Sequence, residues 1–378
     1  MPDGRLIGMD SDPAERASAV LEIDVAGVVA NWRFLAERVA PAECAAVVKA
    51  DGYGLGATVV AASLASAGCR LFFVATLDEA LALRKILPEP CGLAVLNGPP
   101  PGSDAEFAAC DLIPVLNDPG QIAQWERIAA AHGPLPAMLH LDTGMARLGL
   151  TRREFDSLAD KISRPGPVRW QAVLSHLACA DEPGHPLNPE QHARFEALRG
   201  RMPGVRASLA ASSGIFLGYE YHLDLVRPGA ALYGVNPQPG RPNPMRQIVR
   251  LKARILQIRE VDEGQPVGYG ATHIMAADGR LATVAVGYAD GWMRSLSGRG
   301  YGHIGGLRVP LIGRISMDLA VFDVSAVDPS IARAGGFIEL IGDDYDVDAA
   351  AADAGTIGYE ILTALGRRYH RIYRGAVG

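Results

Sequence analysis

The chain has 378 residues, of which 49% are hydrophobic and 21% charged, and its formal net charge is −6. This length allows two or three domains, or one large barrel with a smaller companion, and the composition excludes a disordered or fibrous protein. A net negative charge without a dense block of Lys and Arg argues against a nucleic-acid binder, which would carry a clustered basic face, so we expect a small-molecule ligand.

Residues 1–16 include several charged side chains and lack the apolar core of a secretory signal, so they are predicted to form a flexible N-terminal tail. No stretch approaches the roughly 20 consecutive apolar residues of a membrane helix. We therefore expect a cytoplasmic protein that does not contact a membrane. The five cysteines are odd in number and widely spaced. This pattern suggests neither a disulfide framework nor a C-x-x-C metal site, and no metal is expected.

Between residues 45 and 234 the sequence repeats a short apolar run, a polar or Gly/Pro turn, and an Ala/Leu-rich segment with helical spacing. The apolar runs cover residues 45–49, 71–75, 93–97, 112–116, 137–142, 170–176, 205–211 and 223–233. Strands that alternate with helices form parallel βαβ units, and eight units predict a (β/α)8 TIM-like barrel. The alternative is a doubly wound open sheet, but no G-x-G-x-x-G motif opens its first helix.

After Asn236 a proline-rich hinge leads into strand-like alternation without long helices. The expected strands cover residues 249–261, 281–287, 307–313 and 337–341. A helix over 358–365 precedes a basic segment, 367–371, that we interpret as a solvated helix end. We therefore predict a barrel domain over 17–240 and an all-β C-terminal domain over 241–378.

Lys49 closes the first predicted strand in the segment Val-Val-Lys-Ala-Asp-Gly-Tyr-Gly and would lie at the C-terminal mouth of the barrel, where active sites of this fold collect. Burial there lowers the pKa of the amine, and a neutral amine can form a Schiff base with an aldehyde cofactor. The alternative is a lysine at a strand end that extends its charged head into solvent.

Further polar residues follow the later strands of the predicted barrel. Arg147 follows the fifth strand and suits a carboxylate, although a surface arginine is the alternative. His176 ends the sixth strand, and Ser212-Ser213-Gly214 follows the seventh. A hydroxyl beside free backbone N–H groups can seat a phosphate, although a helix N-cap serine would look the same. The eighth unit adds Arg227 and Gly229.

These motifs resemble those of alanine racemases, and they cover nearly the whole chain after residue 17. The resemblance rests on the Lys49 segment, on Asp-Thr-Gly-Met-x-Arg-x-Gly around Arg147, and on Val-Arg-Pro-Gly-x-x-Leu-Tyr-Gly around Arg227. It continues with segments 267–272, 286–291 and 313–318. It implies a fold-type III enzyme that uses pyridoxal 5'-phosphate, an early strand near residues 17–26 that pairs with the β domain, and a head-to-tail homodimer with shared active sites.

The resemblance also implies two catalytic residues on opposite faces of the substrate. Lys49 holds the cofactor and exchanges a proton on the D-alanine side, and Tyr269 from the neighbouring subunit serves the L-alanine side. A tyrosine is a weak base at its ordinary pKa, so His176 and Arg227 are expected to supply cations that favour the phenolate. Arg227 also faces the cofactor's pyridine nitrogen, which limits the electron-withdrawing power of the ring.

Further binding residues come from the same resemblance. The cofactor phosphate is assigned to Tyr53, Ser213, Gly229 and Ala230, with Tyr233 or a C-terminal residue nearby. The cofactor O3′ and the substrate carboxylate are assigned to Arg147 and to the backbone N–H of Met317 from the partner chain, with Tyr288 at the entrance.

Several positions depart from the family pattern. His140 stands where many members have a carbamylated lysine that orients the arginine seven residues later. Ser212 replaces an asparagine, and Arg367 stands where a C-terminal phosphate-binding tyrosine is common.

The predicted function is the interconversion of L-alanine and D-alanine, which supplies D-alanine for peptidoglycan or serves alanine catabolism. One alternative is a broad-specificity amino-acid racemase of the same fold. The other is a non-catalytic pyridoxal phosphate homeostasis protein, although such proteins lack the second domain.

Overall fold

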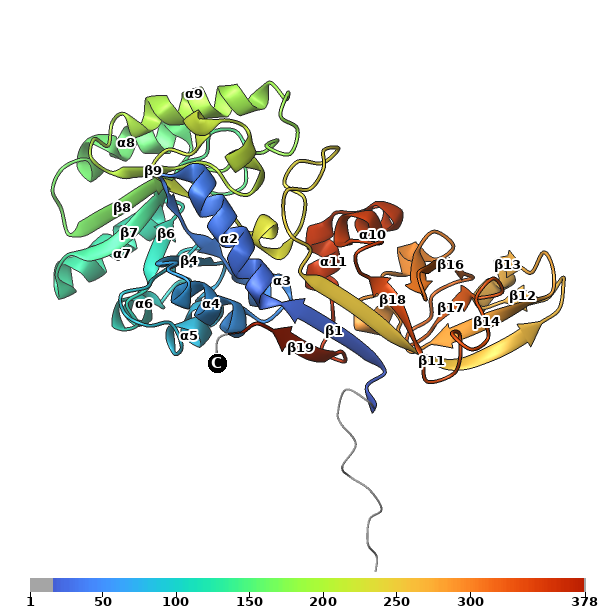
Figure 1. The fold of residues 1–378 in the computed structure, drawn as a ribbon. Helices are drawn as coiled ribbons and strands as arrows, with labels where there is room; N and C mark the ends of the chain where they lie inside the picture. The colour runs from blue at the N-terminus through green and yellow to red at the C-terminus, as the bar shows by residue number, and fades with distance from the viewer. Residues whose placement is uncertain (1–15, 377–378) are drawn as a thin grey trace, which may run out of the picture. The chain divides into compact units, whose positions relative to one another are not determined.

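The computed structural model describes residues 16–376 and divides the chain into two compact units. Among the described residues, one unit is Val25–Arg246, and the other combines residues 16–24 with Gln247–Gly375 (Figure 1). Apart from Arg16, the predicted flexible tail lies outside the described residues. Within the described part, no helix is both long and apolar enough to span a bilayer.

The first unit is a parallel β-barrel. Its main sheet has the order β3-β4-β5-β6-β7-β8-β9. These strands are β3 (Ala46–Val47), β4 (Leu71–Val74), β5 (Gly92–Val95), β6 (Ile113–Leu116), β7 (Leu135–His140), β8 (Val168–Leu174) and β9 (Arg206–Ser208). An eighth strand, β10 (Leu225–Val226), pairs in parallel with β2 (Glu43–Cys44), which leads directly into β3.

Backbone hydrogen bonds close this barrel on both sides of β10. On one side the Arg227 amide donates to Ala210 at 2.9 Å, and on the other the Val47 amide donates to Pro228 at 2.9 Å. The predicted (β/α)8 barrel is therefore confirmed. Strands β4 and β6 are buried along their whole length, as expected for parallel strands covered on both faces.

Helices cover the outside of the barrel strands (Figure 1). They are α2 (Val25–Val39), α4 (Ala57–Ser66), α5 (Leu77–Arg84), α6 (Asp104–Ala109), α7 (Pro119–His132), α8 (Arg152–Ile162) and α9 (Leu187–Arg199). Capping boxes start two of them, because Thr76 and Glu79 cap α5 and Thr151 and Glu154 cap α8. After the last two strands the chain forms short 3-10 helices, η1 (Ser213–Phe216), η2 (Tyr219–Tyr221) and η3 (Ala230–Tyr233).

The second unit is built on an eight-stranded sheet with the order β14-β17-β16-β15-β18-β11-β1-β19. The strands are β1 (Ala19–Asp24), β11 (Val249–Val261), β14 (Gly279–Val284), β15 (Tyr301–Ile304), β16 (Leu307–Ile312), β17 (Ala320–Asp323), β18 (Phe337–Ile341) and β19 (His370–Arg374). A separate ribbon pairs β12 (Pro266–Val267) with β13 (His273–Ile274). Short 3-10 helices are η4 (Tyr269–Ala271), η5 (Tyr288–Asp290) and η6 (Arg294–Leu296). Strand β1 pairs antiparallel with β11 and parallel with β19.

Two segments of this unit differ from the sequence prediction. The helix α10 (Val347–Ala354) was not predicted, although Asp346 caps its first turn by accepting from the Ala349 amide. It packs beside the predicted helix, observed as α11 (Gly358–Ala364). The interpretation of segment 367–371 as a solvated helix end was wrong, because residues from His370 onward form β19 beside β1.

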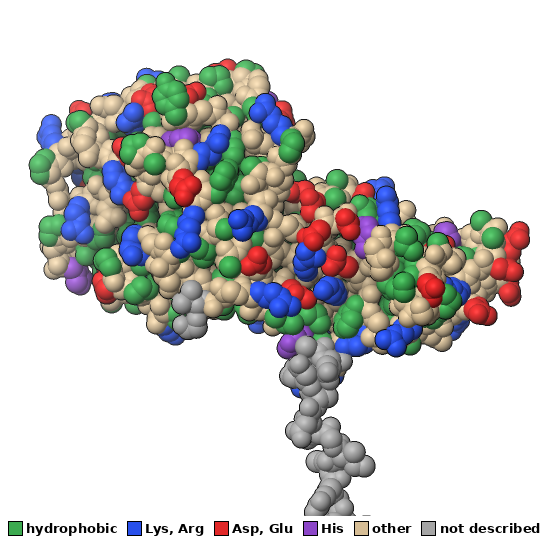
Figure 2. Space-filling view, viewed as in Figure 1, with side chains coloured by type: hydrophobic (Ala, Val, Ile, Leu, Met, Phe, Trp, Pro, Cys, Tyr) green, Lys and Arg blue, Asp and Glu red, His purple; other side chains and the backbone are tan. Residues whose placement is uncertain are grey.

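The surface carries mixed charge. Figure 2 shows Lys and Arg side chains interspersed with Asp and Glu on the visible face of each unit, without a continuous basic patch. This distribution agrees with the absence of a basic block in the sequence.

Candidate active site

Lys49 lies at the start of an unusual turn that follows β3. Residues Ala50, Asp51, Gly52 and Tyr53 have φ values of 53°, 53°, 63° and 55°, so the backbone makes a left-handed turn. Left-handed backbone costs roughly 1–2 kcal/mol for each non-glycine residue. Such strain persists only where the surroundings hold it in place, and it is common at functional sites.

Two carboxylates hold this turn. Glu79 Oε1 accepts from the Ala50 amide at 2.6 Å, and its Oε2 accepts from the Ala75 amide at 2.8 Å. Asp51 Oδ1 accepts from the Ala57 amide at 2.9 Å, which ties the turn to the start of α4. The backbone turn that begins at Lys49 is therefore held by the starts of helices α4 and α5.

The electrostatic environment of Lys49 favours the neutral amine. Burial is the largest cause that lowers its pKa, and the charge of Arg147 lowers it further. Glu79 opposes this shift. A neutral amine is the form that attacks an aldehyde, so the environment suits the chemistry predicted for this residue.

Arg227 places a positive charge inside the barrel mouth. Its side chain is buried, with 4% exposure, and its guanidinium donates to the Ser175 carbonyl at 2.6 Å and to the Ser208 hydroxyl. Burial lowers its pKa to about 10, so it stays charged near neutral pH. Both partners are neutral, and no ion pair of Arg227 occurs within residues 16–376. A buried charge without a counterion is costly, so this position suits a ligand group with a lone pair or a negative charge.

The two histidines at the mouth are neutral. Burial, followed by the charges of Arg227 and Arg147, lowers the pKa of His176 to about 3. The same causes, in the same order, lower the pKa of His140 to about 4. Burial and the surrounding positive charges thus disfavour the protonated ring of His176, which argues against the expectation that this residue supplies a cation.

The proposed phosphate residues lie together beside the loops after β9 and β10. Ser212 Oγ accepts from the Gly229 amide at 3.0 Å and from the Ala231 amide at 3.2 Å. The Gly229 amide is thus already bonded within the protein, which the sequence did not indicate. Ser213 begins η1, and Ala230 begins η3.

Two tyrosines pack against this phosphate region. Tyr53 stacks on Tyr233 with ring centroids 4.7 Å apart, and the Tyr233 hydroxyl donates to the Val47 carbonyl at 3.3 Å. An ideal Cβ on Gly229 would lie 2.9 Å from Tyr53 Cζ, closer than real Cβ contacts allow. Gly229 is therefore required for the Tyr53 ring to lie against this loop.

The remaining predicted residues belong to the second unit and are exposed. The exposed fractions are 71% for Tyr269, 43% for Tyr288 and 54% for Met317. Two bonds join the loops of Tyr288 and Met317, because the Tyr288 amide donates to the Ser316 carbonyl at 3.1 Å and the Ala289 amide donates to the Met317 carbonyl at 3.0 Å.

The structure also identifies residues that the sequence analysis missed. Glu79 holds the Lys49 turn, and the Thr76–Glu79 capping pattern could have drawn attention to it. Arg368 donates to Asp290 at 2.6 Å and to Asp318 at 2.7 Å, and so joins the segments that carry Tyr288 and Met317. No local motif identifies this pairing, because Arg368 lies far from both carboxylates in the sequence.

The donor set at the barrel mouth fits pyridoxal phosphate. Lys49 can bind an aldehyde, Ser213 at the start of η1 and the turn at Ala230 can bind a phosphate, and the buried Arg227 can donate to a ring nitrogen without transferring its proton. In residues 16–376 no cluster of His, Cys, Asp and Glu could hold a metal ion.

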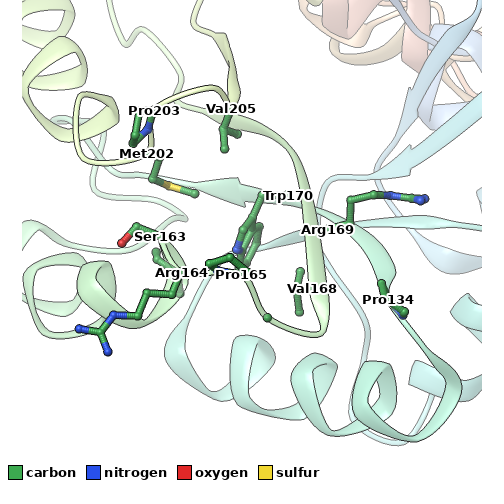
Figure 3. A pocket seen from close by; sticks show the side chains of 12 residues that line it. Pro134, Ser163, Arg164, Pro165, Val168, Arg169, Trp170, Met202, Pro203 and Val205 are labelled. Atoms are coloured by element: carbon green, nitrogen blue, oxygen red, sulfur yellow. The ribbon is translucent and has the colours of Figure 1, made fainter.

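A cavity of about 370 Å³ lies elsewhere in the barrel unit. Figure 3 shows Val168 and Trp170 from β8, together with Met202, among the residues that line it. These residues belong to the start of β8 and to the loop before β9, whereas His176 follows the other end of β8. The cavity is therefore separate from the cluster around Lys49.

Comparisons with known proteins agree with this geometry. Residues 23–237 match the family model "Alanine racemase, N-terminal domain", and residues 248–373 match "Alanine racemase, C-terminal domain". The chain is similar to an alanine racemase of Rhodospirillum rubrum, with 52% identity over 96% of this chain and 97% of the relative. It is 49% identical to a catabolic alanine racemase of Mesorhizobium japonicum, and the match covers 95% of this chain and 94% of the relative. A crystal structure of alanine racemase from Bartonella henselae with covalently bound pyridoxal phosphate superposes with a TM-score of 0.91 at 42% identity, covering 94% of this chain and 99% of that one.

Proposed function

The chain belongs to the alanine racemase family, and we propose that it interconverts L-alanine and D-alanine with pyridoxal phosphate held at the mouth of its barrel. The observation that carries this proposal is that one barrel mouth holds a half-buried lysine whose pKa is lowered and a buried arginine that has only neutral partners. When bound, pyridoxal phosphate withdraws electrons from the amino acid and makes its Cα proton acidic.

The residues of the barrel hold this group from several sides. Lys49 would hold the aldehyde carbon, and Arg227 would donate to the ring nitrogen. Tyr53, Ser213 and the backbone at Gly229 and Ala230 would surround the phosphate. His176, which is neutral, offers a hydrogen bond without adding charge.

Racemisation requires a proton to leave one face of Cα and return to the other, so two acid–base groups are needed on opposite faces. Lys49 Nζ exchanges the proton on the D-alanine side. The Tyr269 hydroxyl exchanges it on the L-alanine side. The sequence suggested two cations, His176 and Arg227, that could stabilise the tyrosinate. Because the pKa of His176 is strongly lowered, Arg227 is the cation that we assign to this role.

A head-to-tail homodimer supplies the second acid–base group. Tyr269, Tyr288 and Met317 are exposed on the second unit of one chain, and the partner's barrel mouth offers the cationic cluster that they would cover. In this arrangement the Met317 amide and Arg147 bind the substrate carboxylate. Tyr288 narrows the entrance and favours a methyl side chain. The cytoplasmic location stays a prediction of the sequence.

The test of the proposed function is the formation of D-alanine from L-alanine by the purified protein. Lys49→Ala should abolish this activity, and Tyr269→Phe should reduce it by roughly 100-fold or more. Tyr219→Phe is a matched control, because Tyr219 is also exposed. Unchanged turnover in Tyr269→Phe would overturn the two-base assignment. Comparable rates on serine or lysine would indicate a racemase of broad specificity, and no turnover with retained cofactor binding would indicate a non-catalytic carrier.

Mixing two inactive variants tests the shared site. If Lys49 of one chain works with Tyr269 of the other, mixed dimers of Lys49→Ala and Tyr269→Phe contain one intact site. Random exchange makes about half of the dimers mixed, so about a quarter of the wild-type activity should return. No recovery after exchange would show that both residues act within one chain.

A further inference from the structure

Arg368 joins two carboxylates of the second unit with one guanidinium group. Its Nε donates to Asp290 Oδ1 at 2.6 Å, and its Nη1 donates to Asp318 Oδ1 at 2.7 Å. Asp290 is buried, with 6% exposure, and its other carboxylate oxygen accepts from the Gly287 amide at 2.9 Å. Asp318 is exposed, with 55% of its side chain accessible. The buried Asp290 therefore fixes the guanidinium, and the fixed guanidinium holds the exposed Asp318 carboxylate.

The segment that carries Asp290 is held from two sides. The Gly366 amide, two residues before Arg368, donates to the Asp290 carbonyl at 2.9 Å. On the other side, an ideal Cβ on Gly287 would overlap the Met317 carbonyl, so these two backbone segments are in direct contact. Arg368 and Met317 thus belong to one packed cluster within the second unit.

The Met317 amide has no acceptor in this cluster. The Met317 carbonyl accepts from the Ala289 amide at 3.0 Å, and the Ser316 amide donates to the Leu319 carbonyl at 2.9 Å. The Met317 amide itself makes no hydrogen bond with any other residue in the described range 16–376. A backbone N–H without a protein partner must bond to solvent or to a ligand, and an anion is a suitable acceptor.

Asp318 places a negative charge directly beside this amide. It follows Met317 in the sequence, and consecutive Cα atoms lie about 3.8 Å apart. Two like charges a few ångströms apart repel each other, and the repulsion grows where water is excluded. An unpaired Asp318 carboxylate would therefore oppose the binding of a substrate carboxylate at the Met317 amide. The ion pair with Arg368 removes this opposition.

We propose that Arg368 is a positioning residue for the substrate carboxylate, because it pairs with Asp318 and leaves the neighbouring Met317 amide open to an anion. The inference rests on the role of Met317 under the proposed function. The competing explanation is stability alone, in which Arg368 only neutralises the buried Asp290. The two explanations differ in the effect of removing the Asp318 charge when Arg368 is absent. Removal of that charge restores carboxylate binding under the proposal and has no effect under the competing explanation.

The experiment compares holoenzymes of the wild type, Arg368→Met and the double variant Arg368→Met/Asp318→Asn. Steady-state kinetics give KM and kcat for L-alanine, and equilibrium dialysis with radiolabelled propionate measures carboxylate binding without turnover. We expect Arg368→Met to raise KM and the propionate Kd at least tenfold while kcat changes less than threefold. The double variant should return KM and the propionate Kd to within threefold of the wild type. Arg374→Met is the matched control, because it breaks an exposed ion pair with Glu22 in the same unit and should change neither value.

Two outcomes would overturn the inference. One is wild-type propionate binding in Arg368→Met. The other is a loss of binding that persists in the double variant, which would show that Arg368 acts through the fold and not through the Asp318 charge. A wild type that does not racemise alanine would refute the proposed function, whereas racemisation with unchanged propionate binding in Arg368→Met refutes only the role of Arg368.

Arg368→Met leaves the buried Asp290 carboxylate unpaired, which can prevent folding. In that event Arg368→Met/Asp290→Asn is the variant to measure. It removes the buried charge, keeps an oxygen acceptor for the Gly287 amide, and keeps the unpaired charge of Asp318. The same tenfold loss of propionate binding is expected, and wild-type binding in this variant would refute the inference.

Discussion

Acidification should destabilise the barrel unit through its two neutral histidines. The folded protein holds the pKa of His140 at about 4 and that of His176 at about 3, against an ordinary value of 6.5. As the pH falls below 6.5, the unfolded chain gains protons that the folded chain does not bind. Stability is therefore lost as the pH falls from 6.5 toward the folded-state values. One proton of difference is worth about 1.4 kcal/mol for each pH unit, so a change from pH 7 to pH 5 costs about 2 kcal/mol for each histidine.

Urea unfolding at pH 7 and pH 5 measures this loss. Because glutamine does not titrate, His176→Gln and His140→Gln should each lose about 2 kcal/mol less than the wild type over this pH change. His132→Gln, at an exposed position on α7, is the matched comparison for replacing a histidine. If His176→Gln loses as much stability as the wild type, His176 gains its proton in the folded state, and the argument from burial among cations is refuted.

Three further substitutions test the geometry around the site. Glu79→Ala removes the carboxylate that accepts from the Ala50 amide, and should lower the free energy of unfolding in urea by roughly 2–3 kcal/mol. An unchanged free energy of unfolding would mean that the left-handed turn is stable without this carboxylate. Gly229→Ala forces a methyl group against the Tyr53 ring and should weaken cofactor binding at least tenfold in an absorbance titration of the apoenzyme. A cofactor affinity equal to that of the wild type would contradict this prediction. Asp142→Ala removes the carboxylate that accepts from the amides of Gly144, Met145 and Ala146, and should speed the hydrogen exchange of these amides. Unchanged exchange would show that the rest of the loop orders these amides without the carboxylate.

The barrel was predictable because its strands are buried on both faces and read as short apolar runs. The position of Lys49 followed from the same pattern, since a polar residue that ends such a run must lie at the barrel mouth. Strand β19 was not predictable in this way. Its residues are mainly basic and aromatic, and they become a strand only because β1, from the other end of the chain, lies beside them.

The site shows the same limit. A motif shows which residue follows a strand, but the charge state of His176 depends on two arginines contributed by other strands and on the depth of burial. The partner of His140 is likewise Asn117, which follows the neighbouring strand β6. Neither the charge state of His176 nor the partner of His140 can be read from the residues next to it in the sequence.

The place of β1 in the second unit makes the barrel an insertion within another domain. The chain leaves this sheet after Asp24 and re-enters it beside the same point, because the Asp24 amide donates to the Ile248 carbonyl at 2.8 Å. During synthesis β1 is made long before its neighbours β11 and β19, so the sheet cannot be completed until the C-terminal residues are made. A fragment that begins at Gln247 would lack an internal strand and expose two unpaired edges. Joining β1 to β11 by a short hairpin would instead give a second unit that contains all its strands and no barrel.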